Sequence, residues 1–218
     1  HLIIFLSIAL LGNAGAETFG LYTYEINPDN VSVTITDYPE TATGAIEIPA
    51  TIDGRSVTRI GHAAFWNCSS LTSVTIPDSV TSVGDYAFYG CRSLTSVTIP
   101  DSVTSVGNGA FFLCTSLTSV TIPDSVTSVG DSVFYDCRSL TSVTIPDSVT
   151  SVGPEAFRGC TSLTSIIIPD SVTNMGSSAF AYCSSLTSIT LPDNIEFTSI
   201  GAFAFTNCSA LTDIIIPD

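Results

Sequence analysis

LTSVTIPDSVTSVGDYAFYGCRS, residues 71–93, is the segment that best predicts the fold, because the same sequence recurs with small changes directly after it. The copies begin at Leu94, Leu117, Leu140 and Leu163, so the period is 23 residues. A degenerate copy precedes the series, and Glu196 and Phe197 lengthen a later copy by two residues. Self-similarity at such a period is typical of solenoids and other repeat arrays.

The start of each repeat predicts a short β-strand. In the second complete repeat, Leu94, Val97 and Ile99 are apolar, while Thr98 lies between apolar neighbours. This alternation of β-branched residues favours a strand with Thr98 on its outer face. Pro100 has no amide hydrogen to donate to a sheet, so we expect the strand to end there.

The rest of the repeat predicts a second extended segment and a turn. Val103 and Val106 continue the extended pattern up to Gly107. Ala110, Phe111 and Cys114 then recur at helical spacing, which indicates a single helical or 3₁₀ turn. Pro154 in a later repeat fits the first position of such a turn.

One repeat cannot bury its own apolar edge, so we expect the repeats to stack as parallel coils. Equivalent side chains then form ladders along the array. The leucines run from Leu71 to Leu211, and the phenylalanines are Phe65, Phe88, Phe111, Phe134, Phe157, Phe180 and Phe205. The predicted fold is a repeat solenoid with a parallel β-sheet on one face and short helical or 3₁₀ turns on the other.

The order L-x-x-V-x-I-P, V-x-x-V-G and A-F-x-x-C over residues 46–218 resembles the BspA-type leucine-rich repeat family. The resemblance implies a right-handed leucine-rich-repeat coil and a role in surface adhesion to extracellular or host proteins. Residues 17–45 resemble the amino-terminal β cap of such arrays. Alternation between Phe19 and Tyr38 independently predicts a hairpin turning at residues 27–30. No second cap is evident, so we expect a solenoid truncated at its carboxyl end.

Residues 1–16 are expected to be a signal peptide. The apolar run LIIFLSIALL, residues 2–11, is too short to span a bilayer, which needs roughly 20 residues. Ala14, Gly15 and Ala16 then form a small-residue site that suits cleavage after Ala16. The alternative is a buried first strand. An exported chain is expected to be secreted or on the cell surface, with no membrane insertion of the mature part.

The acidic composition excludes some partners. Five arginines, no lysine and 20 acidic residues give a net charge of −15. Such a field repels phosphate backbones and anionic lipid, so no nucleic acid partner is expected. The acidity serves solubility or attracts basic partners.

The outward threonines are the candidate binding face. They are Thr75, Thr98, Thr121, Thr144 and Thr190, and Ile167 and Ile215 interrupt the series. A regular hydroxyl row can match a repetitive ligand such as ice or a glycan. Threonine is also ordinary on an exposed strand. An extended sheet is nevertheless the largest regular surface of a solenoid.

Cysteine and aspartate ladders predict neither a metal nor a cofactor. Stacked cysteines have parallel Cβ vectors, which favours free buried thiols over disulfides, and a line of ligands cannot close a zinc tetrahedron. The aspartates that follow each proline, from Asp78 to Asp193, suit an Asx turn. A calcium row is the alternative, although each coil offers one carboxylate where calcium needs six to eight oxygens.

The sequence contains no evident set of catalytic residues, so the chain is not expected to be an enzyme. His62 lies beside the first Ala-Phe pair and is expected on the surface. A nucleophile without a base does not form a triad. The sequence favours a secreted or cell-surface adhesion module that binds extracellular proteins through its solenoid. The alternatives are a structural spacer array fused to a missing carboxyl-terminal domain, and a threonine surface that binds ice or glycan.

Overall fold

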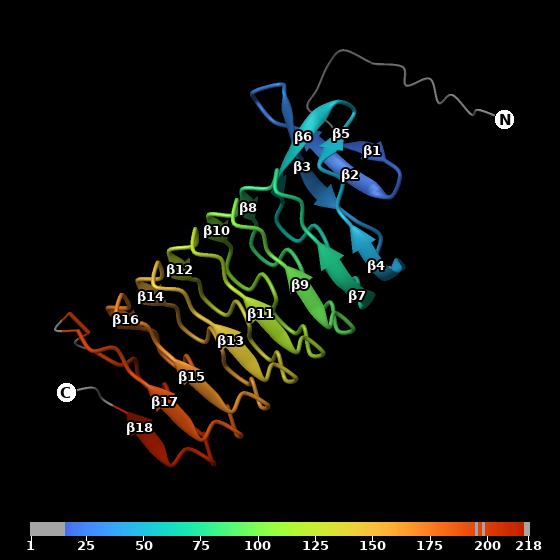
Figure 1. Cartoon of the computed structure of the whole chain (residues 1–218). Coiled ribbons are helices and arrows are strands. Elements are labelled where there is room, and N and C mark those ends of the chain that lie inside the picture. The colour runs from blue at the N-terminus through green and yellow to red at the C-terminus, as the bar shows by residue number, and fades with distance from the viewer. Residues whose placement is uncertain (1–15, 195, 198, 216–218) are drawn as a thin grey trace.

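Each repeat adds one coil, and equivalent positions of successive coils lie side by side (Figure 1). The computed structural model describes residues 16–194, 196–197 and 199–215. The predicted repeat solenoid is confirmed: the chain forms a parallel β-solenoid of about eight turns. The expected signal peptide, residues 1–16, lies outside the described residues except for Ala16.

The first strand of each coil contributes to a row of eight parallel strands, the first strand row. Its members are β4 (Thr43–Glu47), β7 (Ser70–Thr75), β9 (Ser96–Thr98), β11 (Ser119–Thr121), β13 (Ser142–Thr144), β15 (Ser165–Ile167), β17 (Ser188–Thr190) and β18 (Asp213–Ile215). The predicted alternation is confirmed, because Leu94, Val97 and Ile99 are buried and Thr98 is exposed. Pairing crosses the two-residue insertion, where Ile189 pairs with Ile214.

A second strand row follows the proline corner, as the pattern predicts. It contains β6 (Arg55–Ile60), β8 (Ser82–Val83), β10 (Ser105–Val106), β12 (Ser128–Val129), β14 (Ser151–Val152) and β16 (Asn174–Met175). A glycine ends this segment in each coil because the backbones approach closely there. A Cβ on Gly84 would lie 2.7 Å from the carbonyl carbon of Gly61, and real Cβ atoms essentially never come so close.

The predicted helical or 3₁₀ turn is not confirmed, since the described residues contain strands and turns but no helix. Some amides close turns of 3₁₀ spacing, as when Ala87 N–H donates to Gly84 O at 3.3 Å. The amides between them donate to the next coil, as Tyr86 N–H does to Asn108 O at 2.9 Å. The φ of Tyr86 is 54°, in the left-handed region, which a right-handed helix excludes. Bonding between coils therefore replaces the helix that the apolar spacing suggested.

The core is a set of side-chain ladders enclosed by the two strand rows and the turns. Six phenylalanines from Phe65 to Phe180 are at most 1% exposed, and Phe205 is half-buried. Their ring centroids follow one another at 5.0 to 6.0 Å with nearly parallel planes. Each buried ring contributes roughly 1.5–3 kcal/mol relative to exposure.

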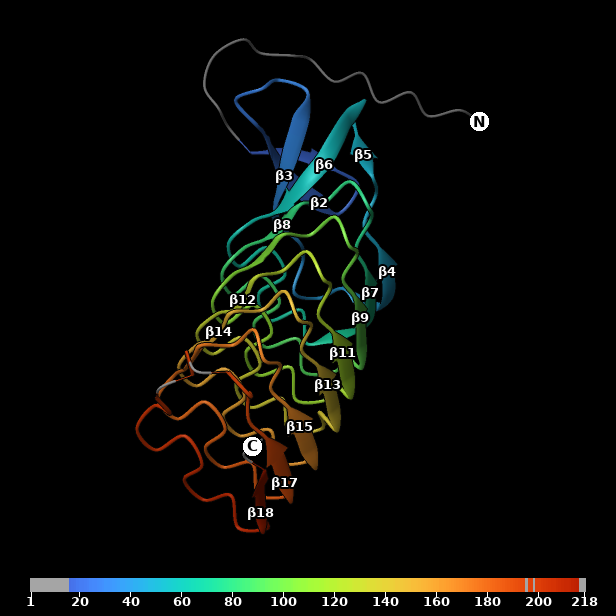
Figure 2. The ribbon, with the colours of Figure 1, turned by 60° about the vertical axis from the view of Figure 1, so that its left-hand side comes forward.

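An antiparallel hairpin covers the first coil (Figure 2). It consists of β1 (Glu17–Phe19), β2 (Tyr22–Ile26) and β3 (Ser32–Asp37), while β5 (Thr51–Ile52) pairs with β6. The expected amino-terminal β-hairpin cap is thus present. The Tyr38 ring lies 5.2 Å from that of Phe65, so the cap shields the start of the phenylalanine ladder from water.

Candidate functional site

The predicted threonine row lies on the outer face of the first strand row. Register pairs Thr75 with Thr98 and Thr121 with Thr144. These four side chains are exposed, and Thr190 is half-buried. Ile167, which is 69% exposed, takes the equivalent position in β15, and Ile215 does so in β18. The face is therefore regular over four strands of hydroxyls and then becomes apolar at Ile167.

Many threonines at two other repeat positions differ from this row in their hydrogen bonds. Thr95 Oγ1 donates to Thr72 O at 2.9 Å, and Thr104 Oγ1 donates to Thr81 O at 3.3 Å. Such bonds tie one coil to the preceding one. Within the described part of the chain, the hydroxyls of the threonine row make no hydrogen bond to another residue. They are free to donate to and accept from a ligand.

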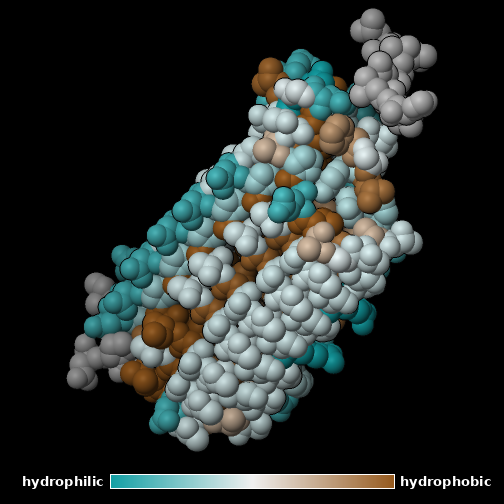
Figure 3. Space-filling view, turned by 45° about the vertical axis from the view of Figure 1, so that its right-hand side comes forward, coloured by the Kyte–Doolittle hydropathy of each residue, from teal (hydrophilic) through white to brown (hydrophobic). Residues whose placement is uncertain are grey.

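A shallow groove of about 710 Å³ borders the row at the proline corner. Thr144 and Ile167 line one side, Pro169 lies at the corner, and Asp147 and Asp170 line the other side. Figure 3 shows the corresponding apolar band between the pale, hydroxyl-covered sheet and a hydrophilic rim. The groove combines an apolar floor with hydroxyl and carboxylate sides.

Within the described residues, the aspartates of the ladder from Asp78 to Asp193 do not form the expected Asx turn, and Asp170 Oδ1 instead accepts from Asp193 N–H of the next coil at 2.8 Å. The corner is closed by the backbone, as when Val103 N–H donates to Pro100 O at 3.0 Å. Ser102 Oγ donates to Val80 O at 2.7 Å and binds the corner to the preceding coil. Among the described residues, no group of three or more histidine, cysteine, aspartate or glutamate side chains could hold a metal ion. The exposed carboxylates thus act as a negative rim to the groove.

A second ladder lies on the outside of the turns, and sequence reasoning missed it. We call Trp66, Tyr89, Phe112 and Tyr135 the outer aromatic row. Successive ring centroids lie 3.8, 5.3 and 4.3 Å apart, with interplanar angles between 4° and 17°. The signal was present, because the residue after each buried phenylalanine is aromatic in four consecutive coils.

The outer aromatic row ends at a pocket with two arginines, the arginine pocket. Its volume is about 460 Å³, and Tyr135, Arg138, Arg158 and Tyr182 line it. The Arg158 guanidinium lies 5.5 Å from the ring centroid of Tyr135 and 4.8 Å from that of Tyr182. A cation between two aromatic faces is stabilised by both rings.

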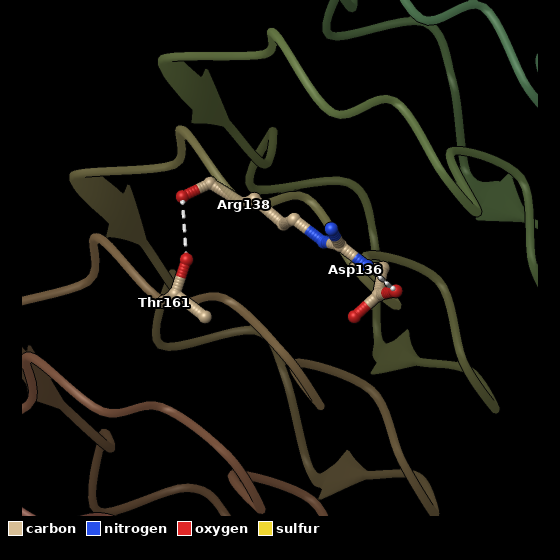
Figure 4. Close-up of polar contacts among 3 residues, drawn as sticks. All are labelled: Asp136, Arg138 and Thr161. Carbon is tan, nitrogen blue, oxygen red and sulfur yellow. Dashed lines mark hydrogen bonds and ion pairs between the residues drawn. The ribbon is translucent and has the colours of Figure 1, made fainter.

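Arg138 lies at the rim of this pocket. Its Nη2 is 2.9 Å from Asp136 Oδ2, and Thr161 Oγ1 donates to its main-chain carbonyl at 3.2 Å (Figure 4). Arg158 Nη1 similarly lies 3.2 Å from Glu155 Oε1. Neither ion pair is buried, so each contributes little to stability. Their effect is to hold the guanidinium groups in place.

The cysteines are free thiols, and six of the seven are buried. Each buried thiol is satisfied by a carbonyl, as Cys91 Sγ is by Phe65 O at 3.2 Å. Burial raises the pKa of Cys68 and of Cys183 to about 12. Since the thiolate is the reactive form, these groups are inert structural side chains.

His62 lies on the surface, as predicted, and its ring is 6.0 Å from that of Tyr86. No carboxylate or hydroxyl nucleophile is bonded to it among the described residues. These residues also include no helix with the length and hydrophobicity of a membrane span.

Comparison with known proteins identifies the repeat. The model of the BspA type leucine rich repeat region matches in six copies over residues 44–160 and 128–218. No curated protein matches the chain.

Several solved structures are similar, and two of them are informative here. The T. pallidum leucine rich repeat protein is 34% identical with a TM-score of 0.82, and the match covers 88% of each chain. A leucine rich cell surface protein from Faecalibacterium prausnitzii is 26% identical with a TM-score of 0.53, and that match covers 96% of each chain.

Proposed function

The chain belongs to the BspA-type leucine-rich repeat family, and from this we propose that it is a secreted or cell-surface module that binds extracellular proteins through its solenoid surface. Leucine-rich repeat proteins generally bind proteins, and arrays of this family are generally non-enzymatic scaffolds. The similar F. prausnitzii protein is described as a cell surface protein, which supports the same location for this chain.

The observation that carries this proposal is the threonine row. A rigid sheet displays hydroxyls that have no partner within the described chain, beside a groove with an apolar floor. A partner therefore gains hydrogen bonds without displacing bonds already made inside the protein. The parallel coils fix the positions of these groups in advance, which lowers the entropic cost of binding.

Processing is part of the proposal. Cleavage after Ala16 would leave Glu17, the first residue of β1, at the new amino terminus. Sequencing the amino terminus of the protein released by an exporting host tests this. A start at Glu17 supports export, whereas an intact leader on protein retained in the cytoplasm contradicts it.

Binding is tested on an array of extracellular and cell-surface proteins. The test variant carries Thr98→Lys, Thr121→Lys and Thr144→Lys, which place long cations over the sheet face. A control of equal charge carries Thr104→Lys, Thr127→Lys and Thr150→Lys, exposed positions outside the first strand row. Thr104 and Thr150 each lose one hydrogen bond to the preceding coil, so circular dichroism must first show that the control is folded. Both variants change the net charge equally.

We expect the wild-type chain and the control to bind the same array members and the test variant to lose them. Equal loss in both variants would show that charge alone matters and would remove the threonine face from the proposal. A wild-type chain that binds no array member would contradict protein binding itself.

A further inference from the structure

The arginine pocket is the one cationic feature on a long stretch of acidic surface. The chain has five arginines and no lysine, and after Ser93 its only cationic side chains are Arg138 and Arg158. They are 20 residues apart in sequence and come from adjacent coils, yet both line the same pocket of about 460 Å³. We propose that this pocket receives a carboxylate side chain from an acidic segment of the partner protein.

Both guanidinium groups keep hydrogen-bond donors for such a ligand. Each contacts its own carboxylate through one nitrogen, Asp136 for Arg138 and Glu155 for Arg158. A guanidinium has five N–H donors, so these single contacts leave others open. The Arg138 side chain is 61% exposed and the Arg158 side chain is 30% exposed, so a ligand reaches both.

Arg158 is held in position before a ligand arrives. The tyrosine rings at 5.5 and 4.8 Å fix its plane from both sides. A fixed guanidinium loses little side-chain entropy when it binds a carboxylate. The two resident carboxylates compete with the ligand, so one acidic group binds weakly and the partner needs further contacts.

The outer aromatic row supplies those contacts. Its rings stack face to face and stay at least partly exposed, and Tyr135 at the end of the row also lines the pocket. Later coils carry Ala181 and Thr206 at the equivalent position, so the fold does not require aromatic residues there. Tryptophan, tyrosine and arginine are the residues that most often dominate binding energy at protein interfaces. The fitting occupant is a peptide segment in which carboxylates alternate with apolar side chains.

This inference rests on the proposed protein-binding function and specifies the partner's chemistry at a second contact. The probe is the blocked peptide Ac-LELELE-NH2, with Ac-LQLQLQ-NH2 as its uncharged match. The readout is the set of arginine Nε–H signals in ¹H–¹⁵N spectra of the full chain, which has only five arginines. N-acetylneuraminic acid, a sugar that carries a carboxylate, tests whether the pocket prefers a sugar acid to an acidic peptide.

We expect saturable shifts at Arg138 and Arg158 with the glutamate peptide and none at Arg92, which follows its own cysteine as Arg138 does. The glutamine peptide should bind roughly tenfold more weakly, because it cannot form charge-assisted hydrogen bonds. Equal binding of both peptides, no shift with either, or stronger shifts with the sugar acid would overturn the proposal.

Variants separate the pocket from the rest of the surface. Arg158→Ala should abolish the shift at Arg138, whereas Arg92→Ala should leave it unchanged, and thiol protection in both reports that the coils remain folded. The variant with three lysines on the threonine face should still bind the peptide. If the wild-type chain binds array proteins but not the glutamate peptide, only the pocket proposal fails. If the peptide binds and no array protein does, the proposed function fails instead.

Discussion

Phe111→Ala tests the stacked core in the middle of the array. The ring is fully buried and lies between Phe88 at 5.4 Å and Phe134 at 5.6 Å. Alanine would leave a cavity between two rings that are held by their own coils and cannot close it. Substitutions of this kind cost about 3–5 kcal/mol, so the free energy of unfolding should fall by that amount.

The neighbouring Phe112→Ala is a matched control. Phe112 has the same chemistry and belongs to the same turn, but it is half-buried in the outer aromatic row, with ring centroids 5.3 Å from Tyr89 and 4.3 Å from Tyr135. It loses two stacking contacts of about 0.5–1.5 kcal/mol each and leaves no enclosed cavity. We expect a cost of about 1–3 kcal/mol, which is below that of Phe111→Ala.

Equilibrium unfolding in urea, followed by far-ultraviolet circular dichroism, measures both variants. With a slope of about 2–3 kcal/mol/M for a chain of this size, Phe111→Ala should lower the midpoint by about 1.5 M. Phe112→Ala should lower it by about 0.8 M, or half as much. Equal costs, or a larger cost for Phe112→Ala, would refute the assignment of inner and outer rings.

Four further expectations concern the thiols, the alkaline limit of stability, the glycine contacts and the threonine face. In the native protein the six buried thiols should be inert to iodoacetamide at pH 8, which leaves the partly exposed Cys208 open to the reagent. The unfolded, unreduced protein should show about seven thiols; fewer than five would indicate disulfides. Because burial raises the pKa of Cys68 and Cys183 from 9.0 to about 12, the unfolded state ionises first, so stability should be constant below about pH 9 and be lost as the pH rises toward 12. A urea midpoint that rises over that interval would contradict this. Gly84→Ala should cost about 1–3 kcal/mol, since its Cβ meets the Gly61 backbone, and an unchanged melting temperature would argue against such close coils. Replacing Thr98, Thr121 and Thr144 by lysine should leave the fold, thermal hysteresis and glycan-array binding unchanged; hysteresis lost with the variant would favour an ice-binding face.

The fold was largely predictable because one 23-residue sequence repeats along the chain. Alternation in Leu94 to Ile99 gave the strand, and Pro100 marked its end, since both signals are local. The turn after Gly107 was not predictable from spacing. Its amides are shared between their own turn and the next coil, and this bonding between coils outweighs the helical preference of the apolar pattern.

The candidate site was predictable only in part. The outward direction of Thr98 follows from strand periodicity, but its lack of a hydrogen-bond partner required coordinates, because Thr95 in the same repeat is bonded to the preceding coil. The arginine pocket depends on two side chains from different coils, Arg138 and Arg158, whose repeat positions differ. The two guanidinium groups come together because extended arginine side chains lie across the turns. The spacing of the repeats does not encode the direction of such side chains.

The central claim is that each 23-residue phrase adds one coil in register, so that the threonine row is continuous. Spin labels on Thr75→Cys and Thr190→Cys test it directly in a Cys208→Ser background, since the six other native thiols are buried and resist labelling in the folded protein. Five coil steps at about 4.8 Å predict a narrow distance distribution near 24 Å by double electron–electron resonance. A broad distribution, or one centred beyond about 40 Å, would contradict in-register stacking and the binding face built on it.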